Sequence, residues 1–166
     1  MSQDTTAGAP DIVAARVNDF LHKSVEPGRF VTAFLGFLDA VTGRFVYVNA
    51  GHNPPVLLRA DGTIERLEEG GLILGIMPDT PFTRGEATLA PGDLLVLYTD
   101  GVTEGANATN EQFGEERLFA SLRAAGTASA HEIAHAIVRE VRAFEGETGP
   151  ADDITVLVAR RMSEPA

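Results

Sequence analysis

The sequence predicts an α+β fold. Short, strongly apolar segments have the length and composition of buried strands, at 30–38, 45–50, 94–98 and 154–160. Longer segments carry apolar residues at helical spacing, at 11–25, 115–126 and 129–144. The order of strands, two helices and a final strand indicates α+β. No repeat or change of composition marks a boundary, so one domain is expected at 11–161, between flexible ends at 1–10 and 162–166.

The first two elements are a helix at 11–25 and a strand at 30–38. The helix has apolar residues at a spacing that predicts one buried face: Val13, Val17, Phe20, Leu21 and Val25. Asp11 is the expected N-cap, and Glu26-Pro27-Gly28 ends the helix. The strand is continuously apolar, so we expect a central strand that is covered on both faces.

Between residues 39 and 89 we expect antiparallel strands that are joined by tight turns. The predicted strands are 45–50, 56–59, 63–67 and a polar strand near 83–89. The predicted turns are 39–44, 51–55 and 60–62, and a Gly-rich segment follows at 70–78. The strands up to residue 67 are expected to form an antiparallel meander.

The last part of the chain contains two strands and two helices. A turn at 91–93 leads into the strand 94–98, and the helices 115–126 and 129–144 precede the final strand 154–160. In the second helix the apolar residues form one stripe: Ile133, Ile137, Val141 and Phe144.

The composition excludes several classes of function. With 13 Lys and Arg against 24 Asp and Glu, the net charge is −11, so nucleic acid and anionic membranes meet an unfavourable field. The chain has no cysteine, which excludes thiol nucleophiles, disulfides and cysteine-ligated metals. No apolar run approaches the roughly 20 residues of a membrane span, and residues 1–10 lack the pattern of a signal peptide. We therefore expect a cytoplasmic protein whose chemistry uses oxygen or imidazole groups.

Carboxylates stand at the ends of two predicted strands. Asp100 comes just after the strand 94–98, and the pair Asp152-Asp153 comes just before the last strand. Carboxylates gathered without His or Cys suit Mg²⁺ or Mn²⁺ better than zinc. Two such ions can polarise a phosphoryl oxygen and activate a shared water without a protein nucleophile. The alternative is that Asp100 forms an ordinary turn with Gly101 and that the aspartate pair lies in a solvated loop.

An H-E-x-x-H motif offers a second hypothesis, a zinc hydrolase. His131 and His135 stand at i and i+4, where they can hold Zn²⁺ while Glu132 activates water. Ser129 and Glu132 also form a capping box, which engages the glutamate at the start of the helix. The two histidines fall on the polar side of the helix with Arg142, opposite the apolar stripe. We therefore prefer a solvated helix face over a zinc hydrolase.

Four segments together resemble a known family. They are YVNAGHNPP (47–55), GDLLVLYTDGVTE (92–104), FGEERL (113–118) and ADDITVLVAR (151–160). In that order and with those gaps they are similar to the PPM-type metal-dependent serine/threonine protein phosphatases. The branch is that of the SpoIIE/RsbU-type phosphatases, which control sigma-factor partner switching. The resemblance implies a sandwich of two antiparallel β-sheets flanked by α-helices, with a binuclear Mn²⁺ or Mg²⁺ centre at one edge.

The resemblance also implies roles for individual residues. The aspartates of the family's TDG and DDxT motifs fall on Asp100 and Asp152, which are expected to be metal ligands. Gly101 is expected to allow the close turn beside Asp100. Asp153 stands where relatives often have Asn, which suits a loop-fixing role, and the reverse assignment of Asp152 and Asp153 stays open.

The segment 49–53 is expected to support the site. By the resemblance, Asn49, Gly51 and His52 shape the adjacent edge, and His52 lines the place where phosphate binds. The alternative is a tight turn in which Gly51, His52 and Asn53 take unusual backbone angles.

The first metal motif of the family, an Asp-Val-x-Gly-x-Gly type segment, is absent. The nearest segment, 39–43, lacks the second glycine and fits a hairpin loop. We therefore expect an N-terminally incomplete domain, the C-terminal portion of a phosphatase, whose open sheet edges favour a homodimer. The resemblance implies hydrolysis of phosphoserine or phosphothreonine by a metal-bound hydroxide, on an anti-anti-sigma-type regulator. The alternative is a degenerate phosphatase-like module that binds protein without turnover.

Overall fold

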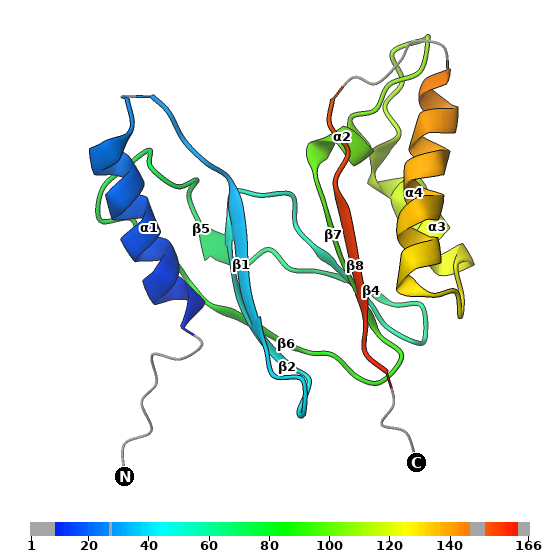
Figure 1. Cartoon of the computed structure of the whole chain (residues 1–166), viewed down its shortest axis with the longest axis horizontal. Coiled ribbons are helices and arrows are strands. Elements are labelled where there is room, and N and C mark those ends of the chain that lie inside the picture. The colour runs from blue at the N-terminus through cyan, green and yellow to red at the C-terminus, as the bar shows by residue number, and fades with distance from the viewer. Residues whose placement is uncertain (1–8, 27, 147–151, 163–166) are drawn as a thin grey trace. The chain divides into compact units, whose positions relative to one another are not determined.

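The computed structural model describes residues 9–26, 28–146 and 152–162. The chain divides into two compact units, each made from separate stretches of sequence, and Figure 1 labels most of their elements. Unit 1 contains Met1–Pro54 and Leu67–Leu89, and unit 2 contains Pro55–Arg66 and Ala90–Ala166. The ends expected to be flexible lie outside the described residues at 1–8 and 163–166, whereas Ala9 and Pro10 are buried at the start of the first helix.

Unit 1 consists of a helix and a four-stranded sheet. Its elements are α1 (Pro10–Ser24), β1 (Ala33–Leu38), β2 (Arg44–Ala50), β5 (Gly70–Gly71) and β6 (Gly85–Thr88). β2 lies in the middle, because it pairs antiparallel with β1 and β6 and parallel with β5. α1 packs against β1 and β2.

The helix expected at 11–25 is confirmed as α1, but its buried face is not the predicted one. Phe20 is 67% exposed and Val17 is 37% exposed, whereas Asn18 is fully buried. The amide group of Asn18 donates to the Met77 carbonyl at 2.8 Å and accepts from the Gly75 N–H at 2.9 Å. A buried loop backbone needs such partners, so the contact with the loop decides which face of α1 turns inward.

Asp11 is not the N-cap of α1. The cap residue is Ala9, which provides no side-chain hydrogen bond, and Asp11 lies in the first turn. There its carboxylate forms an ion pair with Arg84 at 3.2 Å. An acidic side chain in the first turn is favourable because it faces the positive end of the helix dipole.

The strand expected at 30–38 is shorter and less covered than predicted. β1 begins at Ala33, and along its length it pairs with β2 alone among the described strands. Phe37 and Leu38 are 43% and 46% exposed. The prediction of a central strand covered on both faces is therefore wrong for β1. β2 takes that place, because it has strands on both sides and is buried from Phe45 to its end.

Unit 2 consists of a second four-stranded sheet and three helices. Its elements are β3 (Val56–Leu58), β4 (Ile64–Arg66), β7 (Leu94–Tyr98), α2 (Asp100–Thr103), α3 (Gly114–Ala124), α4 (Ala130–Glu145) and β8 (Val156–Arg160). The strand order is β4-β3-β7-β8, and every pair is antiparallel. The helix α2 was not expected from the sequence. The helices α3 and α4 lie close to their predicted ranges and β7 lies at its predicted range, whereas β8 begins at Val156, two residues after its expected start.

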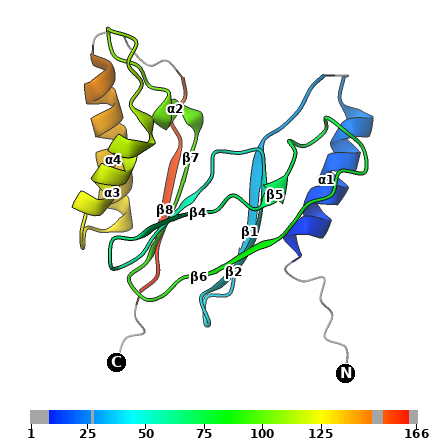
Figure 2. The same ribbon diagram turned by 180° about the vertical axis from the view of Figure 1, so that it is seen from behind.

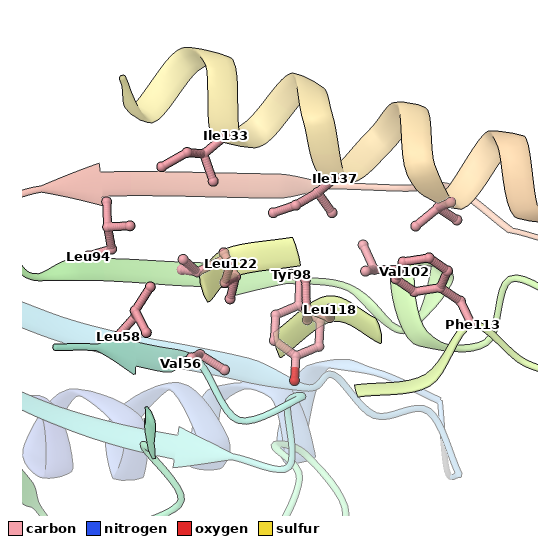
Figure 3. Packing of buried hydrophobic residues seen from close by; sticks show 12 residues of the cluster. Val56, Leu58, Leu94, Tyr98, Val102, Phe113, Leu118, Leu122, Ile133 and Ile137 are labelled. Carbon is pink, nitrogen blue, oxygen red and sulfur yellow. The ribbon is translucent and has the colours of Figure 1, made fainter. Parts of the chain in front are cut away.

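The core of unit 2 lies between its sheet and its helices. It is formed by Val56, Leu58, Leu94, Val96, Tyr98, Val102, Phe113, Leu118, Leu122, Ile133, Ile137 and Val141. Figure 3 shows Ile133 and Ile137 of α4 directed toward the strands of the sheet. The predicted apolar stripe of α4 is thus confirmed, with Phe144 half-buried at its end.

The chain passes from one sheet to the other between β2 and β3. The two strands belong to different sheets and do not pair, so the expected meander is interrupted after β2. Pro54 and Pro55 lie in the connection, and a proline has no N–H to donate to a strand ladder. The α+β class with two mainly antiparallel sheets is confirmed. Among the described helices, none has both the length and the apolar character needed to cross a bilayer.

Candidate metal centre

The pairing of β7 with β8 brings the predicted metal ligands to one edge of the unit 2 sheet. Tyr98, the last residue of β7, is opposite Val156, the first residue of β8. Because the strands are antiparallel, the end of β7 meets the start of β8. Asp100 therefore lies at the same edge as Asp152 and Asp153, with α2 beginning at the end of β7 (Figure 1 and Figure 2).

Thr99 holds the two acidic segments together beyond the strand ladder. Its N–H donates to the Thr155 carbonyl at 3.1 Å. Its hydroxyl accepts from the Thr155 N–H at 3.0 Å and donates to the Asp153 carbonyl at 3.1 Å. Thr99 is the threonine of the TDG motif and Thr155 is that of the DDxT motif, but the sequence alone assigned neither of them a role.

Gly101 fits because of its size. A β-carbon at this position would lie 2.5 Å from the carbonyl oxygen of Asp153, which is closer than real contacts of this kind. The backbone of Gly101 does not have a positive φ angle, so space and not backbone conformation requires the glycine. The close turn expected beside Asp100 is therefore a close approach between Gly101 and the main chain of Asp153.

The three aspartates are exposed and keep acceptor capacity. Asp100 accepts from the Gly101 N–H at 3.0 Å, and Asp152 accepts from the Asp153 N–H at 2.7 Å. None of the ion pairs found within the described residues involves Asp100, Asp152 or Asp153. Ionised carboxylate oxygens without a cationic partner fit a hard divalent cation.

The described residues supply only part of a ligand set. Across 9–26, 28–146 and 152–162, no group of three or more His, Asp or Glu side chains is close enough to hold a metal ion. Asp100 and Asp152 stay the predicted oxygen ligands, and the remaining positions around an ion would need water or other groups.

A buried polar contact supports the end of β7. Tyr98 is 2% exposed, and its hydroxyl donates to Glu115 at 2.9 Å. Burial raises the pKa of Tyr98 well above its ordinary value, and the bond to Glu115 raises the pKa further, so the hydroxyl stays protonated. Arg66 forms an ion pair with the other oxygen of Glu115 at 3.0 Å. The first glutamate of the FGEERL motif, Glu115, thus holds the end of β7, the strand that precedes Asp100.

The arginine of the same motif fixes the chain before α3. Arg117 donates to the carbonyl oxygens of Gln112 and Phe113 at 3.1 and 3.0 Å. Its guanidinium also lies over the ring of Phe144, at 4.6 Å from the ring centre. FGEERL therefore has a structural explanation that its sequence alone did not provide.

Asn49, Gly51 and His52 form a braced turn in unit 1. The side chain of Asn49 accepts from the His52 N–H at 2.8 Å and donates to the His52 carbonyl at 2.9 Å. Of the three residues expected to take unusual backbone angles, Gly51 alone has a positive φ, at 72°, so that expectation is wrong for His52 and Asn53. Asp100 and Asp152 belong to unit 2, and a shared edge with His52 stays a prediction.

The H-E-x-x-H segment forms the capping box that the sequence predicts. The Ser129 hydroxyl accepts from the Glu132 N–H at 3.2 Å, and the Ser129 N–H donates to the Glu132 carboxylate at 2.8 Å. The bond from the Ser129 N–H and a second one, from the Ser129 hydroxyl to the same carboxylate at 2.8 Å, lower the pKa of Glu132. A carboxylate held in this way is poorly placed to activate water, which counts against the zinc hydrolase.

A family model described as Stage II sporulation protein E (SpoIIE) matches residues 1–162. The chain belongs to the SpoIIE family. This is a family of PPM-type, metal-dependent protein serine/threonine phosphatases, in the branch that contains SpoIIE and RsbU. The resemblance carried by the four sequence motifs is thereby confirmed.

Proteins similar to the SpoIIE-family chain include the following two relatives and one solved structure of the same fold. Protein IcfG of Synechocystis sp. is 37% identical over 132 residues, which cover 80% of this chain and 21% of IcfG. Phosphoserine phosphatase RsbU of Bacillus subtilis is 34% identical over 96 residues, which cover 57% of this chain and 29% of RsbU. The SiaA-PP2C domain of Pseudomonas aeruginosa matches with a TM-score of 0.79 at 23% identity, covering 91% of this chain and 60% of that domain. The matched part therefore spans less than a third of the length of either relative.

Proposed function

We propose that this SpoIIE-family chain is a metal-dependent protein phosphatase that hydrolyses phosphoserine or phosphothreonine on a partner protein. The observation that carries the proposal is the convergence of Asp100 and Asp152 at one sheet edge, through the pairing of β7 with β8. Family membership supports the reaction class.

Asp100 and Asp152 are the proposed ligands of Mn²⁺ or Mg²⁺, two of which are expected in a complete domain. Such ions, when bound, polarise a phosphoryl oxygen and lower the pKa of water. The chain contributes the carboxylates and holds them in register: Thr99 ties the two segments together, and Gly101 lets them approach. Asp153, whose carbonyl accepts from Thr99, is proposed to position Asp152. Asn49, Gly51 and His52 are proposed to support the substrate's phosphate.

The proposed substrate is a phosphorylated regulator of the anti-anti-sigma type. The similarity to phosphoserine phosphatase RsbU supports a phosphoprotein over a small phosphate ester. The net charge of −11 requires that cations at the carboxylate edge offset the repulsion between the chain and an anionic phosphoserine.

A phosphatase-like binding module is the second candidate. One observation favours it: among the described residues, no three potential metal ligands lie close enough together to hold an ion. In that case the chain would bind the phosphoprotein without releasing phosphate.

Phosphate release from a phosphoserine peptide tests the proposal. Mn²⁺ is titrated against a chelator control, with a parallel series in Zn²⁺. We expect Mn²⁺-dependent release that Asp100→Asn abolishes while the fold stays intact. The matched control is Asp61→Asn, because Asp61 is an exposed turn residue of unit 2 that accepts from the Thr63 N–H, which asparagine can also do.

The outcomes separate the two candidates. Release that is equal in wild type and Asp100→Asn would refute the assignment of the metal centre. No release at any Mn²⁺ concentration, together with binding of the phosphorylated regulator, would establish the binding module in place of the enzyme.

A further inference from the structure

We propose that His131 and His135 bind a borderline divalent cation, of which Zn²⁺ is the probe, at a site distinct from the carboxylate edge. Both side chains are exposed and lie one turn apart on the polar side of α4. Their Nε2 atoms form a hydrogen bond of 3.1 Å, and their ring centres are 4.3 Å apart. A bound cation would take the place of the shared proton. This pair is not used by the proposed phosphatase reaction, and the inference does not rest on that reaction.

The separation of the two nitrogen atoms matches the geometry of a chelate. A zinc–nitrogen bond is about 2.0–2.1 Å long, so two nitrogens on one ion lie about 2.9 Å apart at a right angle and about 3.3 Å apart at the tetrahedral angle. The observed 3.1 Å lies between these values. Both imidazoles can therefore reach one ion with little rotation. Imidazole nitrogen also selects zinc, copper and nickel over the hard cations expected at Asp100.

The surroundings of the pair leave room for the rest of a coordination shell. A cavity of about 510 Å³ lies beside the two histidines, and it is also lined by Glu132 and Arg139. These two side chains carry opposite charges, and Arg142, on the same side of α4, forms an ion pair with Glu145 at 2.9 Å. Waters in the cavity can fill the positions that the protein does not supply.

The site is expected to bind an ion without hydrolysing a substrate. Glu132, which would activate water in an H-E-x-x-H enzyme, is held by Ser129 in the capping box. No third histidine or carboxylate joins the pair within the described residues. The i, i+4 spacing brings the imidazoles together only while α4 is helical. Zinc should therefore bind the folded chain in preference to the unfolded chain and raise its melting temperature.

The test is a Zn²⁺ titration of the whole chain. Calorimetry measures the affinity, and NMR measures the signals of the imidazole rings. We expect Zn²⁺ to shift the signals of His131 and His135 and to raise the Tm. The variants His131→Ala and His135→Ala should each bind Zn²⁺ at least about tenfold more weakly, because loss of even an outer-shell partner costs about 10- to 100-fold. The double variant should be little worse than either single variant, because one imidazole cannot chelate.

Two controls separate this site from other zinc binding. His22→Ala removes an imidazole of unit 1 that bonds the Gly75 carbonyl. This variant should keep the rise in Tm that Zn²⁺ causes in wild type. Asp100→Asn removes a ligand of the proposed carboxylate edge. In this variant Zn²⁺ should still shift the NMR signals of His131 and His135. The inference is refuted if Zn²⁺ leaves the signals of His131 and His135 in place, or if the His131→Ala and His135→Ala variants bind Zn²⁺ as tightly as wild type.

Discussion

Replacing Thr99 with valine should loosen the connection between β7 and the segment that carries Asp152 and Asp153. Valine keeps the branched shape but removes the hydroxyl, which makes hydrogen bonds of 3.0 and 3.1 Å to the main chain of Thr155 and Asp153. A hydrogen bond contributes about 0.5–1.5 kcal/mol net, so losing both should lower the free energy of unfolding by about 1–3 kcal/mol. The lower part of that range is expected, because Thr99 is half-buried and water can reach the released groups.

Urea unfolding of wild type, Thr99→Val and Thr99→Ser measures this effect. Serine keeps the hydroxyl and should retain most of the stability. If Asp100 and Asp152 hold metal ions, Thr99→Val should also raise the Mn²⁺ concentration needed for half-maximal phosphate release, with less effect on the rate at saturating Mn²⁺. The reasoning fails if Thr99→Val has the same free energy of unfolding as wild type, or if Thr99→Ser loses as much as Thr99→Val.

Three further changes test the packing and the ionisation of unit 2. Gly101→Ala should cost about 1–3 kcal/mol of stability, because its β-carbon would lie 2.5 Å from the Asp153 carbonyl; an unchanged urea midpoint would contradict this close approach. Ile137→Ala should cost about 2–5 kcal/mol, since Ile137 is 1% exposed in the core, and a smaller loss in the same assay would mean that the core relaxes around the gap. The raised pKa of Tyr98 has a consequence at high pH: above about pH 10 the unfolded chain loses the phenol proton while the folded chain keeps it, so the free energy of unfolding should fall as the pH rises. Unfolding measured from pH 8 to 11 should show this fall in wild type and a weaker one in Tyr98→Phe; equal slopes would show that other groups cause it.

Features that depend on residues close together in the chain were predictable from the sequence. The strands β7 and β8 are short apolar runs, and α4 shows its apolar stripe and its capping box within a few residues of each other. The placement of Asp100 and Asp152 near strand ends could also be predicted, because Asp100 follows β7 closely and Asp152 lies a few residues before β8. Their convergence then requires only that these two strands pair in an antiparallel way.

The predictions that failed concern contacts with distant segments. The apolar residues of α1 suggested one face, but the hydrogen bonds of Asn18 to the loop at Gly75 and Met77 turn another face inward. The composition of β1 suggested a central strand, but centrality depends on how many neighbours pair with a strand and not on its own residues.

By itself, the sequence determined the α+β class, the places of α1, α3, α4 and β7, and, through four motifs, the family. The class and these elements depend on periodicity, capping and turn residues, which act between neighbours along the chain. Only the tertiary structure decided that Thr99 bonds Thr155 and Asp153, that Glu115 anchors Tyr98, and that Gly101 must be small. These contacts join residues up to 56 positions apart. The sequence does not show which distant group a hydroxyl will bond, or which distant atom lies where a β-carbon is missing.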